Sequence, residues 1–120
     1  MELKLSEAQR LLAGLNVLEK EDHKFSDDTR LTVAININRL LPIVRAYETV
    51  MVRREHELMG ETFNPMKQAA LSVALSELGD KVEGVDLRLL KLADLNMREN
   101  AKLKGSVVAM VAPIIADFDK

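Results

Sequence analysis

The chain of 120 residues has no cysteine and no tryptophan, and it contains one tyrosine, three phenylalanines and three prolines. Without thiols it cannot form disulfides, thiolate zinc sites or a cysteine nucleophile. The scarcity of aromatic side chains leaves Leu, Val, Ile, Ala and Met for the core, which is typical of packed helices. The 17 basic and 19 acidic residues give a net charge of −2. We therefore expect neither a nucleic-acid partner nor a membrane partner.

The length and the apolar runs limit the architecture further. A chain of this size is typical of one domain, and we expect residues 1–120 to form a single helical domain. Charges interrupt each apolar stretch well before the roughly 20 residues that span a bilayer, and the N-terminus shows no signal-peptide pattern. The sequence therefore predicts a soluble, intracellular protein.

Apolar spacing predicts a mainly α-helical bundle around one long central helix, with a small two-stranded β element. A capping box at residues 6–9 predicts a first helix that ends near residue 20. The Ser-Asp-Asp run at residues 26–28 predicts the start of a helix that continues to residue 59. Pro42 is expected to kink this long helix without breaking it. Its predicted buried seam consists of Val33, Ile37, Leu40, Val44, Tyr47, Met51 and Leu58.

The second half of the chain predicts two more helices and a strand. Asn64 and Pro65 are typical of an N-cap and a first helical position, and the helix is expected to run to residue 78. Its predicted inward residues are Met66, Ala69, Ala70, Val73, Ala74 and Leu78. Residues 82–100 fit both a strand and a helix; we favour a strand over residues 85–92, paired with residues 2–5. Residues 107–117 are apolar on nearly all sides, which predicts a buried final helix.

The long helix carries a second apolar stripe, on the side away from the seam. Four residues form it: Ile35, Ile43, Ala46 and Val50. Arg39 and Arg53 flank the stripe. Two apolar sides indicate two packing partners, the second being either another subunit or another part of the same chain. We take the four residues as a candidate partner-binding surface.

Catalytic and metal-binding motifs are missing. His56 and Glu57 begin like the zinc-protease helix motif, but Gly60 stands where the second histidine is required. His23, the only other histidine, lies in a polar linker and is predicted to be an exposed loop residue. The chain has no nucleophile elbow and no glycine-rich phosphate loop. We therefore expect no enzymatic activity, no cofactor and no metal.

Two basic clusters are candidate anion-binding sites. Arg45, Arg53 and Arg54 gather on the long helix, and Lys102 and Lys104 precede the predicted start of the last helix at residues 105–106. Guanidinium groups hold phosphate in bidentate fashion, and helix N-termini attract anions. The alternative interpretation is a solvated helix face and an ordinary helix cap with exposed lysines.

Several segments resemble known proteins. These are the strand-like start at residues 1–6, the Leu40-Leu41 and Tyr47-Glu48 pairs, and the ending at residues 104–115. Together they resemble small proteins of tailed phages and prophages that have no assigned function. In those relatives the ending commonly has a Leu-x-Pro motif followed by two aliphatic residues, and residues 111–115 of this chain occupy that place. The resemblance implies a phage or prophage origin, a place in the host cytoplasm, and no catalytic residues.

Three functional hypotheses follow from these patterns. The first is a non-enzymatic phage-type protein that binds a host or phage protein, as an oligomer. The second is an oligomeric sponge that sequesters an anionic nucleotide signal and so counters host defence. The third is a virion or assembly component. The sequence does not separate these hypotheses.

Overall fold

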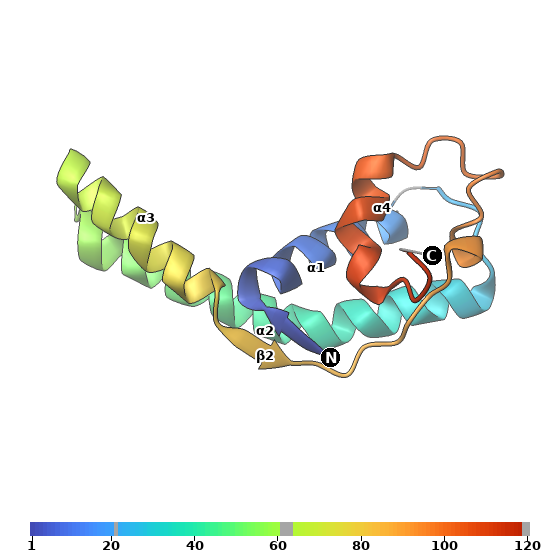
Figure 1. Ribbon diagram of the computed structural model, residues 1–120, viewed down its shortest axis with the longest axis horizontal. Coiled ribbons are helices and arrows are strands. Elements are labelled where there is room, and N and C mark those ends of the chain that lie inside the picture. The colour runs from blue at the N-terminus through green and yellow to red at the C-terminus, as the bar shows by residue number, and fades with distance from the viewer. Residues whose placement is uncertain (21, 61–63, 119–120) are drawn as a thin grey trace.

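The fold is organised by one long helix, α2 (Asp27–Met59), which runs through nearly the whole length of the molecule (Figure 1). The computed structural model describes residues 1–20, 22–60 and 64–118. It confirms a mainly helical architecture around this central helix, together with a small two-stranded antiparallel sheet. Within the described residues, no helix combines the length and the apolar character needed to cross a membrane.

Local sequence signals place both ends of α2. The Ser26 hydroxyl accepts a hydrogen bond from the Thr29 amide at 3.2 Å, and Asp27 and Asp28 follow in the first turn. Gly60 ends the helix with a φ of 61°, a conformation that glycine adopts at no steric cost. Pro42 lies inside the helix, which continues on both sides of it. The first five residues of the predicted seam are buried, and Met51 and Leu58 are half-buried.

Helix α1 (Leu5–Lys20) covers the first half of α2, and α4 (Gly105–Val111) lies beyond α1; together they form what we call the body of the molecule. Helix α1 packs along α2, and the short α4 packs on α1 (Figure 1). Gly14 permits this second contact, because a Cβ atom there would lie 2.9 Å from the Met110 Cβ. The most deeply buried large side chains of the body are Leu11, Leu15, Leu18, Leu40, Leu95, Ile114, Val44 and Val111.

The end of α2 projects from the body together with α3 (Pro65–Gly79), which returns alongside it (Figure 1). We call residues 51–59 and 65–79 the arm. Asn64 caps α3 as predicted, since its side-chain oxygen accepts from the Met66 amide at 2.8 Å. The arm makes the molecule elongated: the radius of gyration is 16.9 Å, against about 14 Å for a compact chain of this length.

The sheet corrects the predicted strand. β1 (Glu2–Lys4) pairs antiparallel with β2 (Val82–Gly84), and Leu3 lies opposite Glu83. The prediction of a strand over residues 85–92 paired with the N-terminus was therefore wrong: the strand covers residues 82–84, and the hydrogen bonds between Met1 and Val85 are the last of this pairing. Residues 92–95 form a 3₁₀ turn, η1 (Leu92–Leu95).

Residues 85–92 are held on α2 by other contacts. Asn36 is fully buried on α2; its side-chain amide donates to the Arg88 carbonyl at 2.9 Å and accepts from the Arg88 amide at 2.8 Å. Leu90 then forms a single parallel bridge with Ile115. The segment is thus extended, with Val85 and Leu90 buried. Beyond Val85, side chains of α2 and the C-terminal segment supply its backbone hydrogen bonds.

Two predicted helix bounds also need correction. Helix α1 begins at Leu5, before the predicted cap, and the Ser6 hydroxyl instead donates to the Gly79 carbonyl at 3.1 Å. The predicted final helix 107–117 is shorter: α4 ends at Val111, and a 3₁₀ turn, η2 (Ala112–Ile114), follows at Pro113. Its apolar side chains are largely buried, as predicted. Residues 61–63 of the predicted linker before α3 lie outside the described residues.

His23 was wrongly predicted to be exposed. Its exposed fraction is 3%, and its ring stacks on Phe25 with 5.3 Å between the ring centroids. The linker is held in place by contacts distant in sequence. The Arg30 guanidinium donates to the His23 carbonyl at 2.6 Å, and the Lys24 amide donates to the Asn100 side chain at 2.6 Å. The polar composition of the linker gave no sign of these contacts.

The inward face predicted for α3 was also largely wrong. Met66 is 82% exposed and Val73 is 59% exposed. Ala69 and Ala70 are exposed too, whereas Ala74 and Leu78 are half-buried. The six predicted residues spread over roughly half of the helix circumference, and only α2 is present to cover them along most of the arm.

Candidate interaction surface

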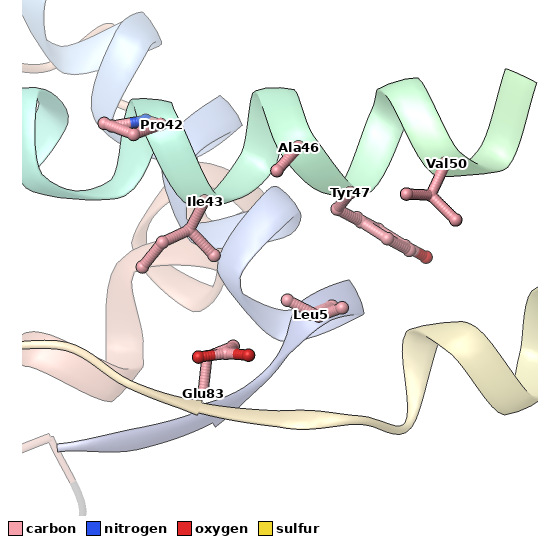
Figure 2. Close-up of a pocket in the computed structure, with 7 residues that line it drawn as sticks. All are labelled: Leu5, Pro42, Ile43, Ala46, Tyr47, Val50 and Glu83. Carbon is pink, nitrogen blue, oxygen red and sulfur yellow. The ribbon is translucent and has the colours of Figure 1, made fainter.

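A groove of about 380 Å³ opens where the arm leaves the body (Figure 2). One wall is a stretch of α2, and the opposite wall comes from the start of α1 and from β2. The lining residues are Leu5, Pro42, Ile43, Ala46, Tyr47, Val50 and Glu83. Six of these seven side chains are apolar or aromatic, so the groove suits an apolar group.

Glu83 supplies the one charge in this lining. Figure 2 shows its carboxylate rising from β2 toward α2, across from Ile43 and Ala46. The pairing of Leu3 with Glu83 sets both side chains on the same face of the two-stranded sheet, the face toward α2. Among the described residues, Glu83 has no basic partner within ion-pair distance. The groove therefore combines an apolar surface with a carboxylate that is available to a cation.

Three of the four predicted stripe residues meet in this groove. Ile43 is half-buried and packs partly against the core, while Ala46 is exposed and Val50 is 44% exposed. Ile35 is half-buried but lies two turns before Ile43 and does not line the groove. The structure thus brings Ile43, Ala46 and Val50 together in the groove and leaves Ile35 outside it.

The arginines that flank the stripe are engaged within the chain. The Arg39 guanidinium donates to the Asp86 carbonyl at 2.7 Å and lies 3.3 Å from the Asp86 carboxylate. Arg53 and Arg54 both contact Glu57, at 3.2 and 3.6 Å. Because these pairs are solvent-exposed, each contributes at most about 1 kcal/mol. A partner with its own carboxylates can therefore displace them.

The two predicted anion clusters lie at opposite ends of the molecule. Arg53 and Arg54 are on the arm, and Lys102 and Lys104 are in the turns before α4 (Figure 1). Arg45 is exposed on α2 between them. A single chain thus does not bring the clusters together.

Lys102 and Lys104 line an open hollow of about 820 Å³. Lys24 also lines it, but its ammonium lies 3.6 Å from a Glu99 carboxylate oxygen, and Asp22 stands nearby. The charge in the hollow is therefore mixed. The following helix, α4, has only seven residues, so it presents a short dipole to an anion.

No cluster of metal-ligating side chains forms among residues 1–20, 22–60 and 64–118. His56 lies exposed near the end of α2, and its carbonyl accepts the capping bond from Gly60 at 3.2 Å.

Sequence reasoning missed four groove residues. Leu5 was assigned to a strand, Tyr47 to the buried seam and Pro42 to a kink. Each of these predictions treated a single helix or strand, whereas the groove is formed by α1, α2 and β2 together. Glu83 had no sequence signal, because its position facing α2 depends on the register of β1 against β2.

Comparison with known proteins gave no match to a protein-family model, a curated protein or a solved structure.

Proposed function

We propose that this chain is a non-enzymatic, phage-type interaction protein that acts as an oligomer and binds a host or phage protein through the α2–β2 groove. The observation that carries the proposal is the groove itself: its wall on α2 is apolar and solvent-accessible at Ala46 and Val50, and Glu83 faces it. Isolated exposed apolar side chains are normal, but a concave apolar patch with a polar rim is typical of a protein-binding site.

The groove indicates the chemistry of its occupant. An opening of about 380 Å³ accepts two or three apolar side chains rather than a whole domain. Glu83 favours a segment that places a lysine or arginine beside those side chains, because an ion pair at the edge of an apolar contact adds specificity. We therefore propose a short amphipathic segment of the partner, apolar on one side and bearing a cation.

The test begins by installing a photo-crosslinking amino acid at position 46 and, in a separate variant, at position 31. Leu31 is the matched control, since it is a 54% exposed apolar residue on the same helix outside the groove. Proteins captured from bacterial extract at position 46 but not at position 31 are identified by mass spectrometry and purified.

Capture alone does not decide the question, so binding of the purified protein is then measured by calorimetry. We expect Ala46→Glu to raise the dissociation constant about a hundredfold or more, since it buries a charge against apolar groups. Leu31→Glu should leave it unchanged, and Glu83→Lys should raise it about tenfold. Equal affinity of the wild type and the Ala46→Glu variant would refute the groove as the binding site.

Two alternative functions have distinct requirements. A nucleotide sponge requires heat of binding with cyclic or linear nucleotides and its loss in an Arg45, Arg53 and Arg54 triple alanine variant. A virion component requires the chain to purify with phage particles. The mixed charge around Lys102 and Lys104 and the pairing of Arg53 and Arg54 with Glu57 favour protein binding over the nucleotide sponge.

A further inference from the structure

The outer face of α3 is the most exposed apolar surface on the arm. Met66, Ala69, Ala70 and Val73 recur at three- and four-residue spacing and are all exposed, Met66 by 82% and Val73 by 59%. The 15 residues of α3 include only two charges, Lys67 and Glu77, and only Leu71 and Gly79 are buried. A helix that is apolar on both sides but covered on one is expected to have a second partner.

The surface area supports a partner of substantial size. The chain exposes 7968 Å², whereas a compact monomer of this mass exposes about 6,500 Å². The excess of about 1,500 Å² is larger than the roughly 800 Å² that a standard interface covers on each partner. An excess of this size is enough to form an interface with another protein.

The charges on α3 indicate that the partner is a second copy of the chain. Lys67 lies in the first turn and Glu77 near the last, so each stands at the helix end whose dipole disfavours it. In an antiparallel pair of identical helices, each of these charges lies beside the end of the neighbouring helix whose dipole favours it. This arrangement brings Lys67 toward the partner subunit's Glu77, at both ends of the contact, whereas a parallel neighbour would oppose like charges.

We propose that α3 pairs antiparallel with α3 of a second copy, so that two arms form a four-helix bundle. A twofold axis midway between residues 71 and 72 places Val73 opposite the partner subunit's Ala70. The same axis places Met66 opposite the partner subunit's Glu77. Lys67, the next residue along the helix, therefore lies close to that carboxylate. Small residues at the centre let the two helices approach closely, and the ends are held by opposite charges.

This proposal names the surface behind the oligomeric form in the proposed function, but it uses residues outside the groove. Failure of one therefore leaves the other testable: Ala46→Glu is expected to keep the oligomer, and substitutions on α3 are expected to keep the groove intact.

The first experiment measures mass by sedimentation equilibrium as a function of protein concentration. We expect the wild type to form a dimer in the micromolar range, and Val73→Glu to raise its dissociation constant about a hundredfold or more by placing a charge at the interface centre. Val52→Glu is the matched control, because Val52 is 53% exposed on the same arm but lies on α2. It should remain dimeric. A wild type that is monomeric at all concentrations, or equal loss of dimer in both variants, would overturn the proposal.

The second experiment tests the antiparallel arrangement by exchanging charges. Lys67→Glu and Glu77→Lys should each weaken the dimer about threefold to tenfold, and the double variant with both substitutions should restore it. A parallel dimer gives a different result, because neither single substitution adds repulsion between like positions. Single variants that dimerise as well as the wild type would refute the antiparallel pairing.

Because the chain has no cysteine, single introduced thiols report the register directly. In the antiparallel pair, residue 70 lies roughly 5 Å along the axis from its symmetry mate, and residue 66 lies roughly 16 Å from its own. A short bis-maleimide should therefore link Ala70→Cys chains efficiently and Met66→Cys chains poorly. Efficient linking of both variants would indicate a parallel dimer and contradict the proposal.

Discussion

The body and the arm of this protein bury apolar side chains to very different extents, although α2 runs through both. In the body, α2 is covered by α1 and by the segment after β2, and Leu40 and Val44 are 0% and 2% exposed. In the arm, α2 meets only α3, and the seam residues Met51 and Leu58 are half-buried. The same apolar spacing along α2 is therefore covered within one chain in the body, whereas in the arm it leaves apolar surface exposed.

The largest expected effect is a cavity in the body. Leu15 is fully buried between helices, so Leu15→Ala should lower the free energy of unfolding by about 3–5 kcal/mol. Urea denaturation followed by circular dichroism measures this loss. A change below about 1 kcal/mol would mean that the body core is far more loosely packed than described, and would remove the contrast with the arm.

A smaller loss is expected at the hydrogen bonds that fix residues 85–92 on α2. Asn36→Ala leaves the amide and carbonyl of Arg88 without their partner in a buried place and should cost about 2–3 kcal/mol. Asn38→Ala, an exposed substitution two residues away, is the control and should cost less than about 0.5 kcal/mol. Equal losses of unfolding free energy in the two variants would show that the hydrogen bonds of Asn36 do not stabilise the fold.

Leu71 tests the arm in the same way as Leu15 tests the body. It is the one buried aliphatic side chain described on α3, and α3 packs mainly on α2, so the site can close around a smaller residue. Leu71→Ala should therefore cost about 2 kcal/mol or less. Hydrogen exchange should show faster exchange confined to α3. Equally faster exchange in α1 would indicate that arm and body unfold as one unit.

The smallest effect is expected on the outer face of α3. In dilute monomer, Val73→Ala should change the free energy of unfolding by less than about 0.5 kcal/mol, because the side chain is already exposed. At concentrations where the chain dimerises, the same substitution should lower the melting temperature measurably. An equal effect at both concentrations would show that Val73 contacts its own chain.

The sequence predicts best where the signal is local. The bounds of α2 follow from the Ser26 cap, the two aspartates and Gly60, all of which act within one helical turn. The strand could not be placed in the same way, because its position depends on Lys81 meeting Leu5 and on Asn36 meeting Arg88, contacts that are distant in sequence. Residues 85–92 are extended with Val85 and Leu90 buried, but Leu89 is 56% exposed, so their apolar alternation marked neither a strand nor a continuous buried face.

The residues of the groove likewise differ in whether a local sequence signal could predict them. Ile43, Ala46 and Val50 were predictable because helical spacing alone puts them on one side of α2. Glu83 was not, since the β1–β2 register determines its neighbours. His23 shows the converse case: it belongs to a polar linker, yet its ring stacks on Phe25, Arg30 donates to its carbonyl, and the neighbouring Lys24 bonds to Asn100.

Because α2 runs unbroken from the body into the arm, it fixes the direction in which the arm faces relative to the body. Each residue added to a helix turns everything beyond it by about 100° and advances it by about 1.5 Å. A single residue inserted after Val50 would therefore swing the open side of α3 about a quarter-turn around the helix axis relative to the groove. Four inserted residues would nearly recover the original direction at a separation about 6 Å greater. The number of helical residues between Pro42 and Gly60 thus determines the relative directions of the groove and the outer face of α3.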